Sequence, residues 1–393
     1  MEHGSVGERI AYWRKRRGLS QKVLAGLVGR SASWMTKVER GDRIVDKLSV
    51  LLALSYALKV DLGKLVGGVE LSPNGGGPLD PPRGIAAVRR ALFTPPPERE
   101  PLTAAELRAG VDRAKRLRQA GSHEAVGIVL PELITAGRTA AAQDAPDVWW
   151  CLAGVYQVAA SLARTVGEVD LALLAADRAV PAARHSGDGL LVAVSERLLA
   201  CALMRQGLLD EAGAVCSNGA DALAPTDATP LEGWAVWGSV QLTLAVAAIR
   251  GGDGAGAWRV LRDARGAAER VGPGRNDYWE AFGPANVGAI GVAVALEAGD
   301  PVEALRVADT VEVDELPSAE RRARFCIDTA RAHILRQDDA ATVGLLLEAE
   351  GHASEVVRHS VLARELARVC LGRERRSRTP SLRGLAERLG VLD

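Results

Sequence analysis

The stretch Ser20–Asp42, SQKVLAGLVGRSASWMTKVERGD, decides how the N-terminal part of this chain folds. Its spacing predicts two short helices joined by a tight turn. Ser20 and Ser31 stand where the two helices begin, and a serine hydroxyl there accepts hydrogen bonds from the free N–H groups of the first turn. Gly29 lies between the helices and suits the turn there, because glycine tolerates the positive φ that such a turn requires. Gly41 ends the second helix.

The two helices have distinct apolar and polar faces. Leu24, Ala25 and Val28 form an apolar stripe on the first helix, and Met35 and Val38 face inward from the second. The opposite face of the second helix carries small or cationic residues, namely Ala32, Ser33, Thr36 and Lys37. Such a face suits a helix that enters the major groove of DNA. The sequence therefore predicts a DNA-binding helix-turn-helix.

These residues resemble the lambda-repressor-like, xenobiotic-response-element (XRE) family of helix-turn-helix regulators. The resemblance is carried by Gln21, Ala25, Gly29, Ser31, Val38, Glu39, Arg40 and Gly41. The run from Ser31 to Leu58 is similar to the actinobacterial branch of that family. The match covers residues 6–66 and implies a five-helix DNA-binding domain over residues 1–66. Its other helices are expected at Val6–Arg17, Leu48–Leu58 and Asp61–Val66.

Nine residues are predicted to contact DNA: Gln21, Ser31, Ala32, Ser33, Trp34, Thr36, Lys37, Arg43 and Lys47. The resemblance implies that Gln21 positions a phosphate and that Ser33 reads a base. Thr36 and Lys37 are expected to read base edges beside Ser33, while Arg43 holds a backbone phosphate beyond the second helix.

Two features near this face keep more than one interpretation. Trp34 either touches a thymine methyl group, as we expect of Ala32, or is half-buried against the domain. The run Arg14–Arg17 either complements the negative end of the first helix or holds phosphates.

Composition and charge indicate a helical protein with a basic N-terminal part. A chain of 393 residues is long enough for two or more units. Aromatic residues make up only 4% and helix-forming Ala and Leu dominate, which predicts an all-α fold. Residues 1–66 hold 13 of the 49 Lys and Arg but only 6 of the 49 Asp and Glu, as expected if only this part meets a polyanion.

The sequence favours a cytoplasmic protein. We find no signal peptide and no uninterrupted membrane-spanning run. The cysteines show no CxxC spacing, which predicts buried free thiols at Cys151, Cys201, Cys216, Cys326 and Cys370.

Residues 67–102 are predicted to form a linker. The runs PNGGGPLDPP and TPPPEREP contain too much Pro and Gly for a continuous helix. Between them, residues 85–93 are expected to form a short helix that docks on either neighbour. At the other end, residues 373–393 are expected to form a C-terminal cap with a helix over Ser381–Leu389, and the basic run before it is a solvated hinge or a second phosphate contact.

From residue 103 to 372 the sequence repeats one pattern. A long helix ends, a glycine turns the chain, an acidic residue caps, and an Ala-rich second helix starts. The turns begin at Gly121, Gly167, Gly207, Gly251 and Gly299, with a degenerate copy at Gln337. Because one helix hairpin cannot bury its apolar face alone, five or six such units should stack into a right-handed superhelix.

These turns resemble the tetratricopeptide (TPR) repeat, although the repeats are longer than in that family. A superhelix of this kind has a concave groove lined by the first helix of each unit. These first helices are expected at Asp147–Thr165, Gly189–Gln206, Glu232–Arg250, Trp279–Ala298 and Ser318–Gln337. Candidate ligand contacts in the groove are Trp150, Tyr156, Arg197, Trp234, Trp237, Gln241, Asn286, Arg324 and Asp328. The alternative for the tryptophans is core packing between hairpins. For Asn286 we favour a groove-lining amide, which can hold a peptide backbone.

No catalytic motif is apparent, so we predict that the protein is not an enzyme and uses no cofactor. His352 and His359 would lie two turns apart on a continuous helix, but no third ligand has suitable spacing, so no metal site is predicted.

The resemblance to XRE regulators with TPR domains implies a sequence-specific transcription regulator. Its groove would bind a signalling peptide or small molecule, and the protein would act as a homodimer on double-stranded DNA. The alternative is a protein-interaction scaffold that its N-terminal domain localises on DNA. The two differ in whether a groove ligand changes DNA affinity.

Overall fold

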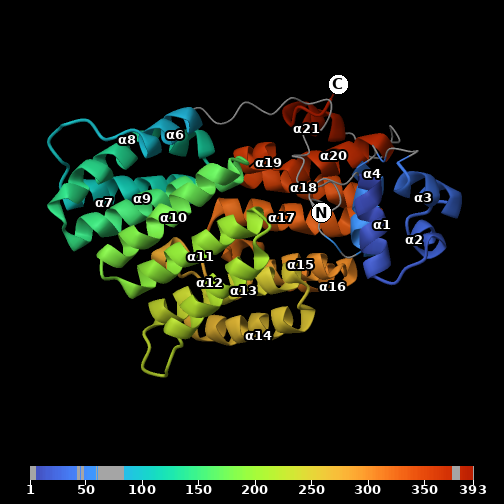
Figure 1. Ribbon diagram of the computed structural model, residues 1–393. Helices are drawn as coiled ribbons and strands as arrows, with labels where there is room; N and C mark the ends of the chain where they lie inside the picture. Colours follow the sequence, from blue (N-terminus) through green and yellow to red (C-terminus); the bar gives the residue numbers. More distant parts are fainter. Residues whose placement is uncertain are drawn as a thin grey trace. The chain divides into compact units, whose positions relative to one another are not determined.

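The computed structural model describes residues 6–41, 45, 48–58, 60, 84–373 and 381–392. Every regular element in these ranges is a helix, which confirms the all-α prediction. The chain divides into two compact units (Figure 1). Unit 1 comprises residues 1–79, 371–373 and 390–393, and unit 2 comprises residues 80–370 and 374–389.

Unit 1 contains four described helices before residue 60. They are α1 (Val6–Arg16), α2 (Gln21–Leu27), α3 (Ala32–Glu39) and α4 (Leu48–Leu58). The predicted fifth helix at residues 61–66 lies outside the described residues, as does the predicted linker up to residue 83. The helices enclose a small apolar core whose fully buried residues include Ile10, Leu24, Met35 and Leu54.

Unit 2 is built from helix hairpins that stack side by side (Figure 1). In the described part they are α7 (Ala104–Gln119) with α8 (His123–Ala140), α9 (Pro146–Thr165) with α10 (Val169–His185), α11 (Gly189–Arg205) with α12 (Leu209–Ala222), α13 (Leu231–Gly251) with α14 (Gly254–Val271), α15 (Pro284–Ala298) with α16 (Pro301–Ala308), and α17 (Ala319–Leu335) with α18 (Asp339–His352). Short 3₁₀ turns stand at Ala141–Gln143, Asp277–Trp279 and Val313–Glu315.

Among the described residues after position 83, three further helices follow α18, and one precedes α7. The later ones are α19 (Ser354–His359), α20 (Val361–Arg373) and α21 (Leu382–Arg388). The earlier one is α6 (Ile85–Phe93), inside the segment predicted as a linker. Its Ile85, Val88 and Leu92 are buried in the same core as α8 and α9, so α6 is part of unit 2.

The turn inside each hairpin has the backbone that its glycine predicts. Gly121, Gly167, Gly207 and Gly299 have φ between +76° and +84°. In the fourth hairpin this position is Gly252 rather than the expected Gly251, and in the last hairpin Gln337 takes φ +63°. Acidic side chains cap the second helix in the last three hairpins, at Asp253, Asp300 and Asp338.

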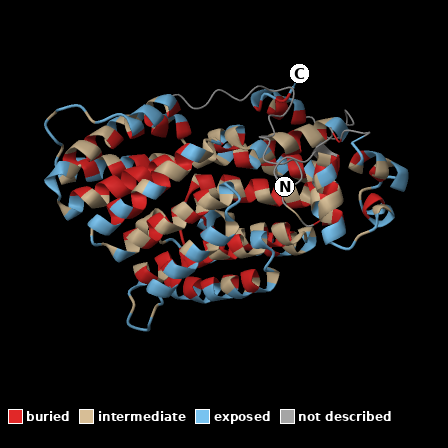
Figure 2. Cartoon of the chain, viewed as in Figure 1, coloured by how far each residue is buried: buried red, intermediate tan, exposed pale blue. Residues whose placement is uncertain are grey.

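The helices of unit 2 form two layers. The first helices of successive hairpins contact one another from α7 to α17, and the second helices pack outside them. Helix α9 is the most enclosed, because every residue from 151 to 163 is buried (Figure 2). Alanine and glycine supply much of this burial, which lets neighbouring helices approach closely.

The inner layer closes on itself, since α17 contacts α7. The Arg118 Nη1 and Glu320 Oε2 atoms lie 3.0 Å apart across this junction. At the next turn, the backbone N–H of Glu124 donates to the Glu355 carboxylate at 2.8 Å, and the rings of His123 and His359 are 5.6 Å apart. The first and last hairpins therefore meet, and the expected open groove is an enclosed interior.

The predicted helix Trp279–Ala298 is wrong at its start, because α15 begins at Pro284. Proline is favoured in the first turn of a helix and disfavours helical backbone in the residue before it. The segment Arg275–Gly283, which we call the crossing loop, is irregular instead. Its residues Tyr278, Trp279 and Ala281 have φ values of +50°, +65° and +52°.

Two segments of the described chain are long and apolar enough to span a membrane by length and composition alone, at His123–Gln143 and Asp277–Ala298. In the fold, 44% and 61% of their most apolar windows are buried inside the protein. The same composition is found in core helices of soluble proteins, and both segments belong to packed hairpins of unit 2.

Candidate nucleic-acid interface and enclosed charge cluster

Helix α3 presents the predicted DNA-contacting residues on one exposed face. Ala32, Ser33 and Lys37 are exposed and Thr36 is half-buried, while Met35 and Val38 are fully buried on the other side. We call the first four residues the reading face. The hydroxyl of Ser31 accepts the backbone N–H of Trp34 at 3.1 Å, so Ser31 caps the helix as expected.

A hydrogen-bonded network holds α3 from behind. The Arg14 guanidinium donates to both carboxylate oxygens of Glu39, at 2.5 and 2.8 Å. Gln21 donates to Glu39 at 2.7 Å and accepts from the Thr36 hydroxyl at 2.9 Å. Burial alone would raise the pKa of Glu39, but the hydrogen bonds from Arg14 and Gln21 outweigh it and lower that pKa. Three helices are thereby tied to one carboxylate.

The network changes the interpretation of two residues. Arg14, the first residue of the basic run, is buried and paired with Glu39. It therefore stabilises the fold and does not contact a phosphate. Gln21 orients α3 through Thr36, and its predicted phosphate contact stays a prediction. Trp34 is half-buried against the core, with the Arg30 guanidinium 5.7 Å from its ring. The predicted phosphate contacts Arg43 and Lys47 lie outside the described residues.

In unit 2, charged side chains gather where the inner layer closes. Six cations and two carboxylates form what we call the inner cluster: Lys115 and Arg118 from α7, Arg164 from α9, Arg197 from α11, Arg321, Arg324 and Glu320 from α17, and Glu280 from the crossing loop.

The two carboxylates of the cluster are well paired. Glu320 accepts from Arg118 at 3.0 Å and from Arg324 at 2.9 Å. Burial would raise the pKa of Glu320, but Arg324 and Arg118 outweigh burial and hold it well below its usual range. Glu280 is 4% exposed and meets the Arg197 guanidinium at 2.7 and 2.9 Å.

The cations are less well satisfied. Lys115 is 3% exposed, and its Nζ has no hydrogen-bond partner among the described residues. Burial, reinforced by Arg118, lowers the pKa of Lys115 to about 8. The Arg164 Nε also lacks a partner among the described residues, and burial together with Arg324 lowers the pKa of that side chain to about 10. Even with Asp112 near Lys115, the cluster has an excess of positive charge, and its Lys115 is buried.

The crossing loop reaches across the interior and touches several inner helices. The amides of Asn276 and Gln119 exchange two hydrogen bonds, at 2.8 and 3.0 Å. The Tyr278 hydroxyl donates to Asp188 at 2.9 Å, and the Trp150 indole donates to the same carboxylate oxygen at 3.1 Å.

The loop is also seated tightly, in a costly backbone conformation. Phe282 packs so closely on Gly238 that a Cβ there would lie 2.0 Å from the Phe282 ring. The left-handed backbone at Tyr278, Trp279 and Ala281 costs about 1–2 kcal/mol for each residue. The loop contacts must offset this cost.

The structure places only some of the predicted groove residues in the interior. Arg197 and Arg324 belong to the inner cluster, and the buried Asn286 accepts from Arg321 at 2.8 Å. Gln241 is buried with its Oε1 lacking a partner among the described residues. Asp328 is half-buried on α17, and burial raises its pKa to about 6.

The aromatic candidates pack between helices instead. Tyr156 is 6% exposed in the core of the first hairpins. Trp234 and Trp237 are in edge contact at 6.1 Å, and the Trp237 indole donates to the Ala220 carbonyl at 3.2 Å. Trp150 is half-buried, with the Arg108 guanidinium 4.0 Å from its ring. Core packing, the alternative interpretation, describes Tyr156, while Trp234 and Trp237 are half-buried between helices, and a ligand contact by these three residues stays a prediction.

Sequence reasoning missed most of the inner cluster. Lys115, Arg118, Arg164, Glu280 and Arg321 come from four elements that are distant in the chain. The available signal was a charged residue within an otherwise apolar helix, as at Arg164 near the end of α9.

Within the described part of the chain, one group of side chains could hold a metal ion. Cys326, Glu348 and His352 each bring a ligand atom, and these atoms lie within 4.8 Å of one another. Burial and the neighbouring Glu348 raise the pKa of the Cys326 thiol to about 12. A protonated thiol bonded to Glu348 accounts for the arrangement without an ion. His352 and His359 stand on different helices, α18 and α19, and do not form a pair along one helix.

Comparisons with known proteins agree with the N-terminal interpretation. Residues 5–65 match the family model of a helix-turn-helix domain. Among solved structures, the chain is similar to Bacillus thuringiensis PlcR in complex with the peptide PapR7 and DNA, with 12% identity and a TM-score of 0.38. That match covers 85% of this chain and 98% of the other. The search of curated proteins gave no match. Unit 1 thus carries a helix-turn-helix domain, and the function has to be inferred from the residues of this chain.

Proposed function

We propose that the protein is a sequence-specific DNA-binding transcription regulator of the XRE type, with unit 2 as a TPR-like sensor. The reading face of α3 is the observation that carries this proposal. It is small, polar and cationic, it is exposed, and the Arg14–Glu39–Gln21–Thr36 network fixes its orientation before DNA arrives. Such preorganisation lowers the entropic cost of binding.

The proposed roles follow from the chemistry of the four side chains. Ser33, Thr36 and Lys37 read base edges in the major groove, and Ala32 contacts a thymine methyl group. The basic balance of residues 1–66 attracts the phosphate backbone. We further propose a homodimer, because one such helix reads few base pairs and a two-fold pair of heads doubles the site.

The experiment that tests this proposal uses the full chain. Duplexes selected from a random pool by the wild-type protein are used in a gel shift with Lys37→Ala, Ser33→Ala and Arg336→Ala. Arg336 is an exposed cation of unit 2 and serves as the matched control. We expect Lys37→Ala to weaken binding about tenfold, since one good base contact is worth about 1–3 kcal/mol.

The salt dependence then separates two roles for Lys37. If it reads a base, Lys37→Ala lowers the preference for the selected duplex over random competitor. If it contacts a phosphate, affinity falls for every duplex and the salt slope decreases by about one. Selection of no preferred duplex by the wild-type chain would refute the proposal. Binding of a protein partner to unit 2, with no ligand effect on DNA affinity, would favour the scaffold.

A further inference from the structure

The crossing loop occupies the interior of unit 2 in the way that a bound peptide would. The Trp279 carbonyl accepts from Arg118 at 3.4 Å and from Gln119 at 3.2 Å. The next carbonyl, of Glu280, accepts from Arg321 at 2.7 Å. Side chains from two different helices thus hold two consecutive backbone carbonyls, as protein grooves hold extended peptides.

The carboxylate of Glu280 completes this likeness. Arg197 donates one hydrogen bond to it at 2.9 Å, and an ion-pair contact joins Arg197 Nε and Glu280 Oε2 at 2.7 Å. Guanidinium groups commonly recognise carboxylates through two such contacts. The loop nevertheless leaves positive charge unmet, since the Lys115 amine is buried without a hydrogen-bond partner among the described residues. The Lys115 amine lies 5.3 Å from the centre of the Trp150 ring, but a buried cation without a hydrogen bond is still costly for a fold, and such groups cluster at functional sites.

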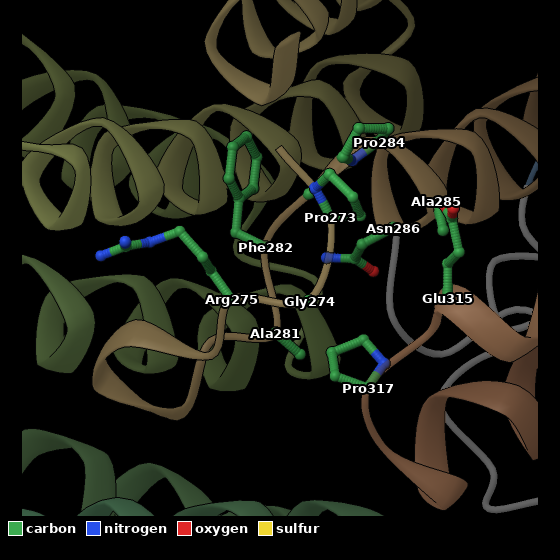
Figure 3. A pocket seen from close by; sticks show the side chains of 11 residues that line it. Pro273, Gly274, Arg275, Ala281, Phe282, Pro284, Ala285, Asn286, Glu315 and Pro317 are labelled. Atoms are coloured by element: carbon green, nitrogen blue, oxygen red, sulfur yellow. The ribbon is translucent and has the colours of Figure 1, made fainter. Parts of the chain in front are cut away.

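The space beside the loop is too small for a ligand while the loop is in place. A cavity of about 10 Å³ lies between the loop, the start of α15 and Pro317, with Phe282 and Asn286 in its wall (Figure 3). That volume holds about one water molecule. A larger cavity of about 360 Å³ is lined by Glu350, Ser354 and Arg358, away from the loop and the inner cluster. Any ligand of the inner cluster must therefore displace the loop.

We propose that the inner cluster is a binding site for a carboxylate-bearing ligand and that the crossing loop is its built-in competitor. The ligand carboxylate replaces that of Glu280 on Arg197, and its carbonyl groups replace those of the loop on Arg118, Gln119 and Arg321. Lys115 neutralises a second negative group. This inference rests on the proposed function in one respect only, that ligand binding reports to DNA. An acidic peptide and a small carboxylate share the required chemistry.

The strained backbone makes the competition feasible. Tyr278, Trp279 and Ala281 give up an unfavourable left-handed backbone when the loop leaves, whereas a free ligand carries no such strain. A ligand can displace the loop only if it binds more tightly to the state in which the loop has left the inner cluster. A carboxylate has this preference because it neutralises the cations that are uncovered when the loop leaves.

The experiment titrates the full chain by calorimetry with two synthetic peptides. One has the loop sequence of residues 276–282, NDYWEAF, and the other has Gln in place of its Glu. In the Glu280→Gln variant the internal competitor is weakened, so we expect the first peptide to bind about tenfold more tightly than to wild type. The Gln-containing peptide should bind at least about tenfold more weakly than the first.

The Arg197→Met change tests the assigned contact. In the Glu280→Gln background it should abolish the discrimination between the two peptides, while the matched control Arg336→Met should leave it intact. A second measurement needs no substitution. In the wild-type chain, saturating peptide should speed hydrogen exchange of the backbone amides in residues 275–283. Titration with free glutamate then separates a peptide site from a small-carboxylate site.

Two results would overturn the proposal. One is that the folded Glu280→Gln variant binds both peptides with equal affinity or binds neither of them. The other is loop exchange in wild type that stays unchanged at saturating peptide. Neither measurement involves DNA, so a failure here is distinct from a failure of the reading face in the gel shift.

Discussion

The two units differ in how completely their buried cations are paired with carboxylates. In unit 1, one buried guanidinium, that of Arg14, donates to both oxygens of one carboxylate, that of Glu39, and Gln21 adds a further hydrogen bond to Oε2. In the inner cluster of unit 2, six cations share two carboxylates, and Lys115 has no hydrogen-bond partner among the described residues. The buried charge of unit 1 is thus matched and that of the inner cluster is not, and this difference is why we propose that a ligand carboxylate completes the inner cluster.

Removing the matched pair should have the largest effect. We expect Arg14→Met to destabilise unit 1 by about 3–5 kcal/mol, because it leaves the Glu39 carboxylate buried without its cation. The hydrogen exchange of backbone amides in α3 measures this loss, with Lys15→Met as the exposed control on the same helix. Unchanged protection of α3 would show that the pair does not hold the reading face.

Removing the unmatched cation should have the opposite sign. At pH 7, Lys115→Met should stabilise unit 2 by about 3 kcal/mol, because the fold lowers the pKa of Lys115 from about 10.5 to about 8. It should also weaken binding of the acidic peptide. Urea denaturation measures the stability, and Arg113→Met is the matched control, exposed on the same helix.

The pH dependence sharpens this second prediction. The folded pKa of Lys115 lies below the unfolded value, so the unfolded chain binds more protons between about pH 8 and pH 10.5. The stability of the wild type should therefore rise with pH in that window, and the advantage of Lys115→Met should vanish above it. A variant that is less stable than wild type at pH 7 would contradict the assignment of Lys115 as an unmatched charge.

The smallest expected effect separates structure from recognition within unit 1. Ser31→Ala should cost about 1 kcal/mol of stability by removing the cap of α3, whereas Ser33→Ala on the exposed face should leave stability within about 0.5 kcal/mol. In the gel shift, Ser33→Ala should lose discrimination between duplexes. If both variants lose stability equally, Ser33 is structural and does not read bases.

Local patterns predicted the helices and most of their ends. The two serine caps, the turn at Gly29 and the repeated glycine turns are short-range features, and short-range features determine where helices start and stop. The start of α15 was the exception. The apolar periodicity suggested an earlier beginning, but Pro284 and the tertiary contacts of Glu280 and Phe282 pull the preceding segment out of the helix.

The enclosed site was less predictable because its parts come from distant positions. Arg197 and Arg324 stood out as polar residues within otherwise apolar helix faces, yet nothing local in the sequence pairs Arg118 with Glu320. The tryptophans were less informative, because the rarity of a residue type does not predict which side of the helix it occupies. Trp234 and Trp237 belong to the outer packing contacts, while the less conspicuous Lys115 faces the cluster.

The meeting of α7 with α17 has a consequence for how unit 2 tolerates change in length. An open array of repeats can gain or lose a terminal hairpin and keep the rest, since each unit touches only its neighbours. Here the Arg118–Glu320 and Glu124–Glu355 contacts make the ends each other's neighbours. Adding or removing a hairpin would separate the first and last hairpins and remove these contacts. The fold therefore constrains the number of hairpins as well as their sequences.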